Sequence, residues 1–389
     1  MEIPLLVVKM TRHFTEKRSR RRAASLRRPK PLRIESLELK LPMDRSLAVS
    51  CRTVGSLETS ACGGQVEAAI VTELSAPEVT TSGDSVSVLV SPSDPLVTLN
   101  LGIAEHVLDI SGTTYNWDAT QVTTFHIETT GTESEVQVFG TSLPDTASVF
   151  DRVGSFSSAA YTVDTEAFRV NTFDGNSGYD YGQMFGSTDS DEIFLHPNDS
   201  VMTTPTDIVQ LLNFDRTDAY GLSGGSDYAH LFGSDGDDTF TTFEGYEVFL
   251  GQNLFYRTSG FERVDVFGKL GEDEAVLADT PNDDSFVGGA DVAYMVTDVL
   301  VWTRGFELVE STSLAGSDTA ILIDFASVDR LFGHSTEASA ARQDRRQNVN
   351  GYRTIVARAA DGESPEYELI LDLEFETILE GDWINASLE

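Results

Sequence analysis

Cysteine is almost absent from this chain of 389 residues. Only Cys51 and Cys62 occur. Their spacing permits a small disulfide loop, but two cysteines cannot define a disulfide-stabilised scaffold. The six histidines show no mutual spacing, and neither an H-E-x-x-H zinc motif nor a G-x-S-x-G nucleophile elbow is present. Hydrophobic residues make up 40% of the chain. Stability must therefore come from a packed core rather than from cross-links or a zinc ion.

Long apolar runs are also missing. The only apolar run near the start of the chain, residues 3–8, is far too short to span a bilayer. It precedes a basic cluster, which is the reverse of the order in an ordinary secretory signal. We therefore expect no transmembrane span.

Basic residues are few and unevenly placed. The chain has 27 Lys and Arg against 63 Asp and Glu, a net charge of −36. Residues 1–45 hold 13 basic and 5 acidic residues, so the remainder carries a net charge of −44. An acidic body repels nucleic acid, which excludes that class of partner, and attracts divalent cations. Solubility in a salty medium is an alternative explanation of the same charge.

The sequence does contain a repeat of about 46 residues. Its best copy begins at Gly225 and reads GSDYAHLFGSDGDDTF. An aspartate opens each copy, and a second aspartate follows 11 residues later. A glycine stands two residues before the first aspartate of the four clearest copies, at Gly178, Gly225, Gly271 and Gly316. Such a repeat indicates an array in which each unit buries its apolar side against its neighbours.

Short β-branched or aromatic segments fill each repeat, for example residues 264–267 and 299–302. Gly, Asp, Asn and Pro bound them, and no segment shows a sustained helical apolar face. The pattern predicts an all-β fold, a parallel β-helix or β-solenoid of about five 46-residue repeats with about two coils each. Equivalent leucines of successive repeats, Leu231, Leu277 and Leu322, are expected to be buried in one column along the axis.

The composition divides the chain into three parts. Residues 1–80 are predicted to be a basic, largely disordered targeting or linker segment. Residues 81–160 are expected to form an N-terminal cap with irregular entry coils, and residues 161–389 the repeat array with a C-terminal cap. Within the array, the polar and basic segment 335–350 is predicted to be a protruding loop.

Two features resemble secreted and surface repeat proteins of planctomycete bacteria. Arginine-rich residues lead into LRIESLELKL at 32–41, which is similar to an N-terminal L-R-x-E-x-L-E-P-R-x-L-L segment of those proteins. Residues 260–288 are similar to their GFExVxAY…GGxDxAxLxDSxGDDxFxG repeat. The resemblance implies export and an extracellular or cell-surface role. It brings no established enzymatic activity, and hence no catalytic residues.

The recurring aspartates are the candidate functional residues. The segment GSDGDDTF resembles the calcium-binding nonapeptide of β-rolls, although each copy stands alone rather than in tandem. Two interpretations remain open: the aspartates bind calcium, or they accept backbone N–H groups within turns. The candidate calcium ligands are Asp189, Asp191, Asp235, Asp237, Asp238, Asp283 and Asp284.

The expected function is that of an exported, acidic structural or adhesive protein at the cell surface or outside the cell. Its expected partners are surface polysaccharide or other envelope components, and calcium is the one candidate cofactor. The alternative is a carbohydrate-active β-helix enzyme, a polysaccharide lyase or glycosidase. Against it, so acidic a body is a poor host for a polyanionic substrate. A groove with converging carboxylate, basic and aromatic side chains would favour the enzyme.

Overall fold

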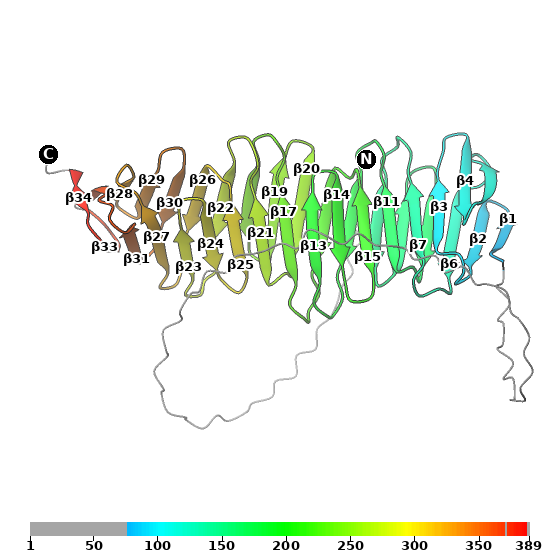
Figure 1. Ribbon diagram of the computed structural model, residues 1–389, viewed down its shortest axis with the longest axis horizontal. Helices are drawn as coiled ribbons and strands as arrows, with labels where there is room; N and C mark the ends of the chain where they lie inside the picture. Colours follow the sequence, from blue (N-terminus) through cyan, green and yellow to red (C-terminus); the bar gives the residue numbers. More distant parts are fainter. Residues whose placement is uncertain (1–75, 370–371, 387–389) are drawn as a thin grey trace, which may run out of the picture. The chain divides into compact units, whose positions relative to one another are not determined.

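The computed structural model describes residues 76–369 and 372–386. They belong to the second of two compact units, Ile70–Glu389, and are built from strands and turns. The predictions for residues 1–75 of the basic segment, which include Cys51 and Cys62, lie outside the described residues. Strands follow one another along one axis as a β-solenoid (Figure 1), which confirms the predicted all-β fold class. Among the described residues no helix is long and apolar enough to cross a membrane.

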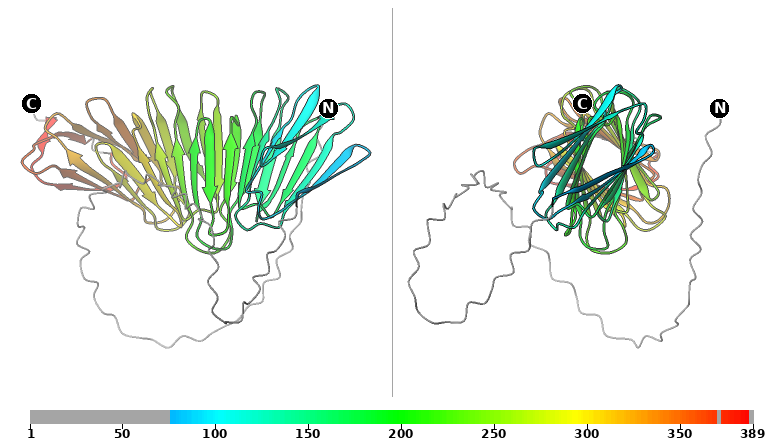
Figure 2. Two further views of the ribbon diagram at one scale, coloured as in Figure 1. Left: turned by 45° about the vertical axis from the view of Figure 1, so that its right-hand side comes forward. Right: turned by 90° about the vertical axis from the view of Figure 1, so that its right-hand side faces the viewer.

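The strands of the described residues form two sheets, which face each other across the core (Figure 2). Sheet A has 18 strands: β1 (Glu78–Ser82), β2 (Ser85–Val90), β6 (Thr124–Thr129), β8 (Thr146–Phe150), β9 (Val153–Ser157), β10 (Thr162–Glu166), β12 (Tyr181–Phe185), β16 (Arg216–Tyr220), β18 (Thr239–Phe243), β19 (Tyr246–Gly251), β20 (Leu254–Ser259), β22 (Glu274–Ala278), β26 (Leu308–Thr312), β28 (Arg330–His334), β29 (Glu337–Ala341), β30 (Arg346–Asn350), β32 (Glu366–Leu369) and β34 (Ile384–Asn385). Sheet B has 16: β3 (Leu96–Asn100), β4 (Glu105–Ile110), β5 (Thr113–Asp118), β7 (Glu135–Phe139), β11 (Val170–Asp174), β13 (Glu192–His196), β14 (Asp199–Thr203), β15 (Ile208–Leu212), β17 (Tyr228–Phe232), β21 (Arg263–Phe267), β23 (Ser285–Gly288), β24 (Val292–Val296), β25 (Leu300–Arg304), β27 (Thr319–Phe325), β31 (Thr354–Ala359) and β33 (Glu376–Glu380).

The chain alternates between the sheets, and every third crossing expands into an antiparallel triplet. From β16 in sheet A the chain passes to β17 in sheet B and then to β18, β19 and β20 in sheet A. Within this triplet β19 pairs antiparallel with both neighbours. Strand β20 pairs in parallel with the earlier β16, and β18 pairs in parallel with the later β22. The order in sheet A is therefore β16, β20, β19, β18, β22. The chain enters the sheet at β18, away from β16, and then folds back through β19 and β20 to fill the space between β16 and β18.

This path makes equivalent residues of successive repeats alternate between the sheets. One repeat contributes a strand in one sheet, a strand in the other and a triplet in the first, which is one and a half turns. Leu231, Leu277 and Leu322 are all 0% exposed, which confirms their predicted burial. The single column was wrong, because β22 with Leu277 lies in sheet A while β17 and β27, with the other two leucines, lie in sheet B.

The core is one continuous cluster of alternating side chains. Along β22, for instance, Ala275 and Leu277 are buried, whereas their neighbours are half-buried on the outer face. This period of two is the geometry of a strand with one face against a core. The aromatic residue that recurs before each glycine is also buried, and closes the core where the chain changes sheets: Phe168, Phe214, Phe261, Phe306 and Tyr352.

The loop predicted for residues 335–350 is instead most of a triplet. Strand β29 pairs antiparallel with β28 and β30. Its inward residues, Ala338 and Ala340, are buried. Alanine has low strand preference and small apolar area, so the alternation was hidden among polar and basic outward residues. Residues within 81–160 form strands of the same kind, with β3, β4 and β5 as a triplet in sheet B.

Replacing Leu277 by Ala removes a fully buried side chain in the middle of the stack, and we expect the free energy of unfolding to fall by about 2–5 kcal/mol. Equilibrium unfolding in urea measures the change. The exposed Leu270 of the same repeat supplies the control, since Leu270→Ala should change stability little. Equal effects of the two substitutions would contradict the assignment of Leu277 to the core.

Candidate functional site: the acidic turns

The repeated aspartates lie in the turns that connect the two sheets. Asp227 precedes β17, for example, and Asp238 precedes β18. Unlike ordinary turn carboxylates, most of them are buried: Asp180, Asp191, Asp227, Asp238, Asp273, Asp284 and Asp318. Buried carboxylates require hydrogen-bond donors or a compensating charge. Their partners therefore decide between the two interpretations of the aspartates.

The second aspartate of each repeat closes its own turn. Asp238 accepts hydrogen bonds from the backbone N–H of Ser234 at 2.6 Å and from its hydroxyl at 2.8 Å. Asp191 accepts the same two bonds from Ser187, at 2.5 and 2.8 Å. Asp284 accepts them from Thr280, at 2.8 and 2.7 Å. These bonds are the turn-capping contacts that one interpretation of the aspartates requires.

The first aspartate of each repeat links its coil to a neighbouring one. The backbone N–H of Asp238 donates to Asp273 Oδ1 at 2.9 Å, and the N–H of Asp273 donates to Glu307 Oε2 at 2.8 Å. The same two-step arrangement joins Asp191, Asp227 and Glu262, and also Asp145, Asp180 and Asp215. We call these sets of stacked acids the carboxylate ladders. The last acceptor of each ladder is the acid that directly follows a buried phenylalanine in the sequence: Asp215, Glu262 or Glu307.

The glycine before each first aspartate allows the neighbouring turns to approach closely. Gly225 has φ of 71°, and a Cβ there would collide with the backbone of Asp189 and Ser190 in the neighbouring turn. Gly271 has φ of 121°, and a Cβ there would lie 2.6 Å from the carbonyl carbon of Gly236. Both the backbone conformation and the close packing demand glycine.

Burial raises the pKa of the ladder carboxyls. Loss of hydration raises the pKa of Asp180, Asp227 and Asp273 to about 6, although an N–H donor opposes the shift in each case. The Oδ2 atoms of Asp180 and Asp227 are buried and have no hydrogen-bond partner in the described part of the chain. The ladders therefore hold negative charge where water cannot solvate it well.

The exposed members of the predicted calcium set are Asp189, Asp235, Asp237 and Asp283, and three of them have partners of their own. Asp235 forms an ion pair with Lys269 at 2.6 Å, and Asp237 accepts the backbone N–H of Glu272 at 2.9 Å. Asp283 accepts the N–H of Ser317 at 2.8 Å, and Asp189 is exposed. The structure thus divides the predicted ligands between solvent and the turn interior. Calcium binding by these residues stays a prediction.

Two groups of three acidic or histidine side chains come close enough to share a metal ion, among the residues that the structure describes. One consists of Asp279, Asp284 and Asp318, all buried. Of these, the sequence-based set contains only Asp284. Asp318 follows Gly316 as the first aspartate of its repeat. Asp279 stands where three other turns have glycine, and this departure from the repeat is the sequence signal that could identify it.

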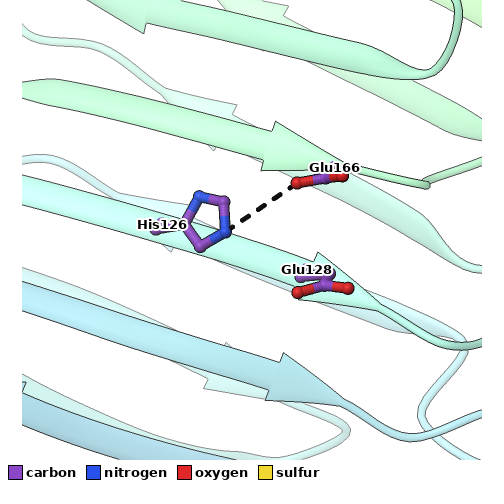
Figure 3. Close-up of side chains that lie close together, drawn as sticks. All are labelled: His126, Glu128 and Glu166. Atoms are coloured by element: carbon purple, nitrogen blue, oxygen red, sulfur yellow. Dashed lines mark ion pairs between the residues drawn. The ribbon is translucent and has the colours of Figure 1, made fainter.

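The other group lies on the outer face of sheet A. Figure 3 shows His126 and Glu128 on β6 beside Glu166 on the neighbouring β10. His126 Nε2 and Glu166 Oε2 are 4.0 Å apart, with side chains 46% and 53% exposed. Water solvates all three groups, so the arrangement requires no metal ion.

A groove of about 470 Å³ opens on the outer face of sheet A, over β26, β28, β29, β30 and β32. A chain of hydrogen bonds runs across it. Arg346 Nε donates to Ser339 Oγ at 3.0 Å, Ser339 Oγ donates to Asn348 Oδ1 at 2.9 Å, and Asn348 Nδ2 donates to Glu310 Oε1 at 3.3 Å. Phe332, His334, Glu337 and Glu368 also line the groove.

An aromatic ladder crosses the outer face of sheet B. His196 stacks on Phe232 with ring centroids 4.1 Å apart, and Phe232 stacks on Phe267 at 4.8 Å. Trp302 meets Phe267 edge-on at 5.5 Å. The stacked rings cover one another's faces, so these faces are not free to stack on a sugar ring. The ladder stabilises the coils instead.

Comparison with known proteins adds no assignment: no family model, curated protein or solved structure gives a significant match to this chain.

Glu247 supplies a pH test of the buried acids. It is buried in β19, and Thr258 Oγ1 donates to it at 2.7 Å. Burial raises its pKa from 4.5 to about 7, because the buried site favours the neutral carboxyl group over the carboxylate. The folded state is therefore more stable when Glu247 is protonated. That stabilisation is complete below pH 4.5 and is lost as the pH rises through about 7. Glu247→Gln should therefore raise the free energy of unfolding at pH 8 by about 2–3 kcal/mol, and change it little at pH 4.

The neighbouring Glu244 is exposed in the turn before β19 and provides a matched control. Glu244→Gln should leave the pH dependence of unfolding as it is in the unsubstituted chain. Chemical denaturation at both pH values measures it. An E247Q protein whose stability changes with pH as steeply as the unsubstituted chain would contradict the shifted pKa.

Proposed function

We propose that this chain is an exported structural or adhesive protein of the cell surface or extracellular space, and that its solenoid binds polysaccharide. The observation that carries the proposal is the groove over β26 to β32, with its ordered hydrogen bonds on a regular sheet. A sheet held by pairing on both sides positions such side chains precisely. The resemblance to planctomycete surface repeat proteins supports export, which the fold itself does not address.

The lining of the groove suits a neutral sugar chain. Asn348, Ser339 and Glu310 offer donors and acceptors for hydroxyl groups, and Phe332 offers an apolar surface. Three glutamates line it against one arginine and one histidine. Their charge, added to that of the acidic body, disfavours uronate-rich or sulfated chains. The favoured partner is therefore a neutral surface polysaccharide.

The same groove is the observation that favours the second candidate, a carbohydrate-active enzyme. Hydrolysis of a glycoside uses two carboxyl groups, one of which must stay protonated in a sheltered position. Glu337 and Glu368 are exposed, and Glu310 accepts a hydrogen bond from Asn348. This arrangement supports binding better than catalysis.

Calcium stabilisation is part of the proposal. The ladders collect buried carboxylates at both edges where the chain changes sheets, and an external medium rich in divalent cations would offset their mutual repulsion. The fold forms its turns through hydrogen bonds to backbone N–H groups, so the cation would add stability rather than define the fold.

Sedimentation of the full chain with insoluble neutral glucan, neutral mannan and polygalacturonate tests the proposal. We expect binding to a neutral polymer and weak binding to polygalacturonate. Asn348→Ala should weaken the neutral binding about tenfold, because it removes hydrogen bonds to the ligand. Asn116→Ala changes an exposed asparagine on β5, in the opposite sheet, and should have no effect.

Release of new reducing ends from any of the polymers would favour the enzyme instead. Binding to polygalacturonate alone, or unchanged affinity of N348A for the neutral polymer, would contradict the groove as the adhesive site.

A further inference from the structure

Three buried carboxylates meet where the turn before β23 lies against the turn before β27. Asp279, Asp284 and Asp318 each offer an oxygen atom, and these atoms all lie within 4.8 Å of one another. Their exposed fractions are 7%, 5% and 1%. Three negative charges at this separation and burial repel strongly unless a positive charge lies among them.

The chain's own repeats show that Asp279 is an addition to the turn. At the corresponding position, five residues before the capping aspartate, three other turns have glycine (Gly140, Gly186 and Gly233), and the turn before β28 has the exposed Asp324. In the turns with glycine a Cβ would collide with the capping aspartate, Asp145, Asp191 or Asp238. The fold therefore needs no side chain there, and accommodates Asp279 by a local adjustment. The turns with glycine lack this third carboxylate, and Asp324 of the turn before β28 is exposed rather than buried.

The hydrogen bonds of the described residues leave one fully buried oxygen of the three carboxylates without a partner. Asp279 Oδ1 accepts the backbone N–H of Leu314 at 2.8 Å. Asp284 Oδ2 accepts the two bonds from Thr280. Asp318 accepts the N–H of Asp284 at 2.7 Å and the hydroxyl of Ser313 at 2.6 Å.

Asp279 Oδ2 is this oxygen: it is fully buried and has no donor among the described residues. Within the described residues, no Lys, Arg or His forms an ion pair with any of the three carboxylates. A buried anionic oxygen without a donor, facing two further carboxylates, is the environment that a cation would satisfy.

We infer that Asp279, Asp284 and Asp318 bind one divalent cation of the hard, oxygen-preferring kind, for which Ca²⁺ is the natural probe. Carboxylates are the ligands such cations prefer, and Ca²⁺ tolerates the irregular geometry of turn oxygens better than Mg²⁺ does. One cation would tie the turn after β22 to the turn after β26, and so would join two coils. Part of its coordination shell would be water.

This site gives a location to the calcium stabilisation in the proposed function, but it does not depend on export or on the groove. Polysaccharide binding can fail while the cation binds, and the reverse can hold as well. The two proposals are therefore tested separately.

Calorimetric titration of the full chain with CaCl₂, and thermal unfolding in CaCl₂ against NaCl of equal ionic strength, test the inference. We expect a saturable site and a melting temperature several degrees higher in Ca²⁺ than in matched NaCl, because the cation binds the folded form alone. Asp279→Gly introduces the glycine that three other turns have, so the protein should fold and lose the Ca²⁺-specific response. Asp279→Asn, which keeps the side-chain shape, should lose it too.

Asp189→Asn is the matched control. It removes one negative charge from an exposed position in a corresponding turn, and the Ca²⁺ response should persist. Equal melting temperatures of the unsubstituted chain in Ca²⁺ and in matched NaCl would overturn the inference. So would a full Ca²⁺ response in D279G. A proton shared between Asp279 and Asp318 would show itself as stabilisation at low pH with no Ca²⁺ response, and this result would also overturn it.

Discussion

The hydrogen bond from a backbone N–H group to a carboxylate in the neighbouring turn is the interaction on which this solenoid depends. Strand pairing stacks the coils, but parallel and antiparallel pairing alone would not fix where the chain leaves one sheet for the other. The carboxylate ladders do so, since the N–H of one turn aspartate is bonded to the side chain of the next acid, as from Asp238 to Asp273 to Glu307. Each ladder satisfies backbone donors that a tight turn would otherwise leave unpaired.

The ladders also concentrate charge. A carboxylate that accepts backbone N–H groups is favoured in its ionised form, whereas burial favours the neutral form. In Asp227 and Asp273 burial is the larger effect, and the pKa rises to about 6. The hydrogen bonds of the ladders therefore stabilise the turns, whereas the burial of their negative charges at neutral pH destabilises the folded state. At Asp279 a third buried carboxylate joins two others, and this grouping of three distinguishes the turn from the corresponding turns with glycine.

Much of the fold could be read from the sequence because stacking imposes fixed spacing. Leu231, Leu277 and Leu322 hold the same offset from an aspartate, and all three are buried. The alternation of sheets could not be read in the same way, because a repeat of equal length fits two full turns or one and a half turns with a triplet. The strand of alanines in β29 was missed because its inward residues carry almost no hydrophobic signal.

In the site, the sequence indicated aspartates at turns, but which oxygen atoms meet depends on two turns far apart in the chain, and spacing within one turn cannot reveal it.

The half-integral number of turns in a repeat has a consequence for how such a protein can change length. Loss or duplication of a single repeat would move each strand that follows it from one sheet to the other. The groove now formed by β26, β28, β29, β30 and β32 would then open on the opposite side of the stack. Units gained or lost in pairs would keep every outward surface in place. A lineage that depends on one binding face is thus expected to lengthen or shorten its array by even steps, and an odd step would act as a switch of the face presented.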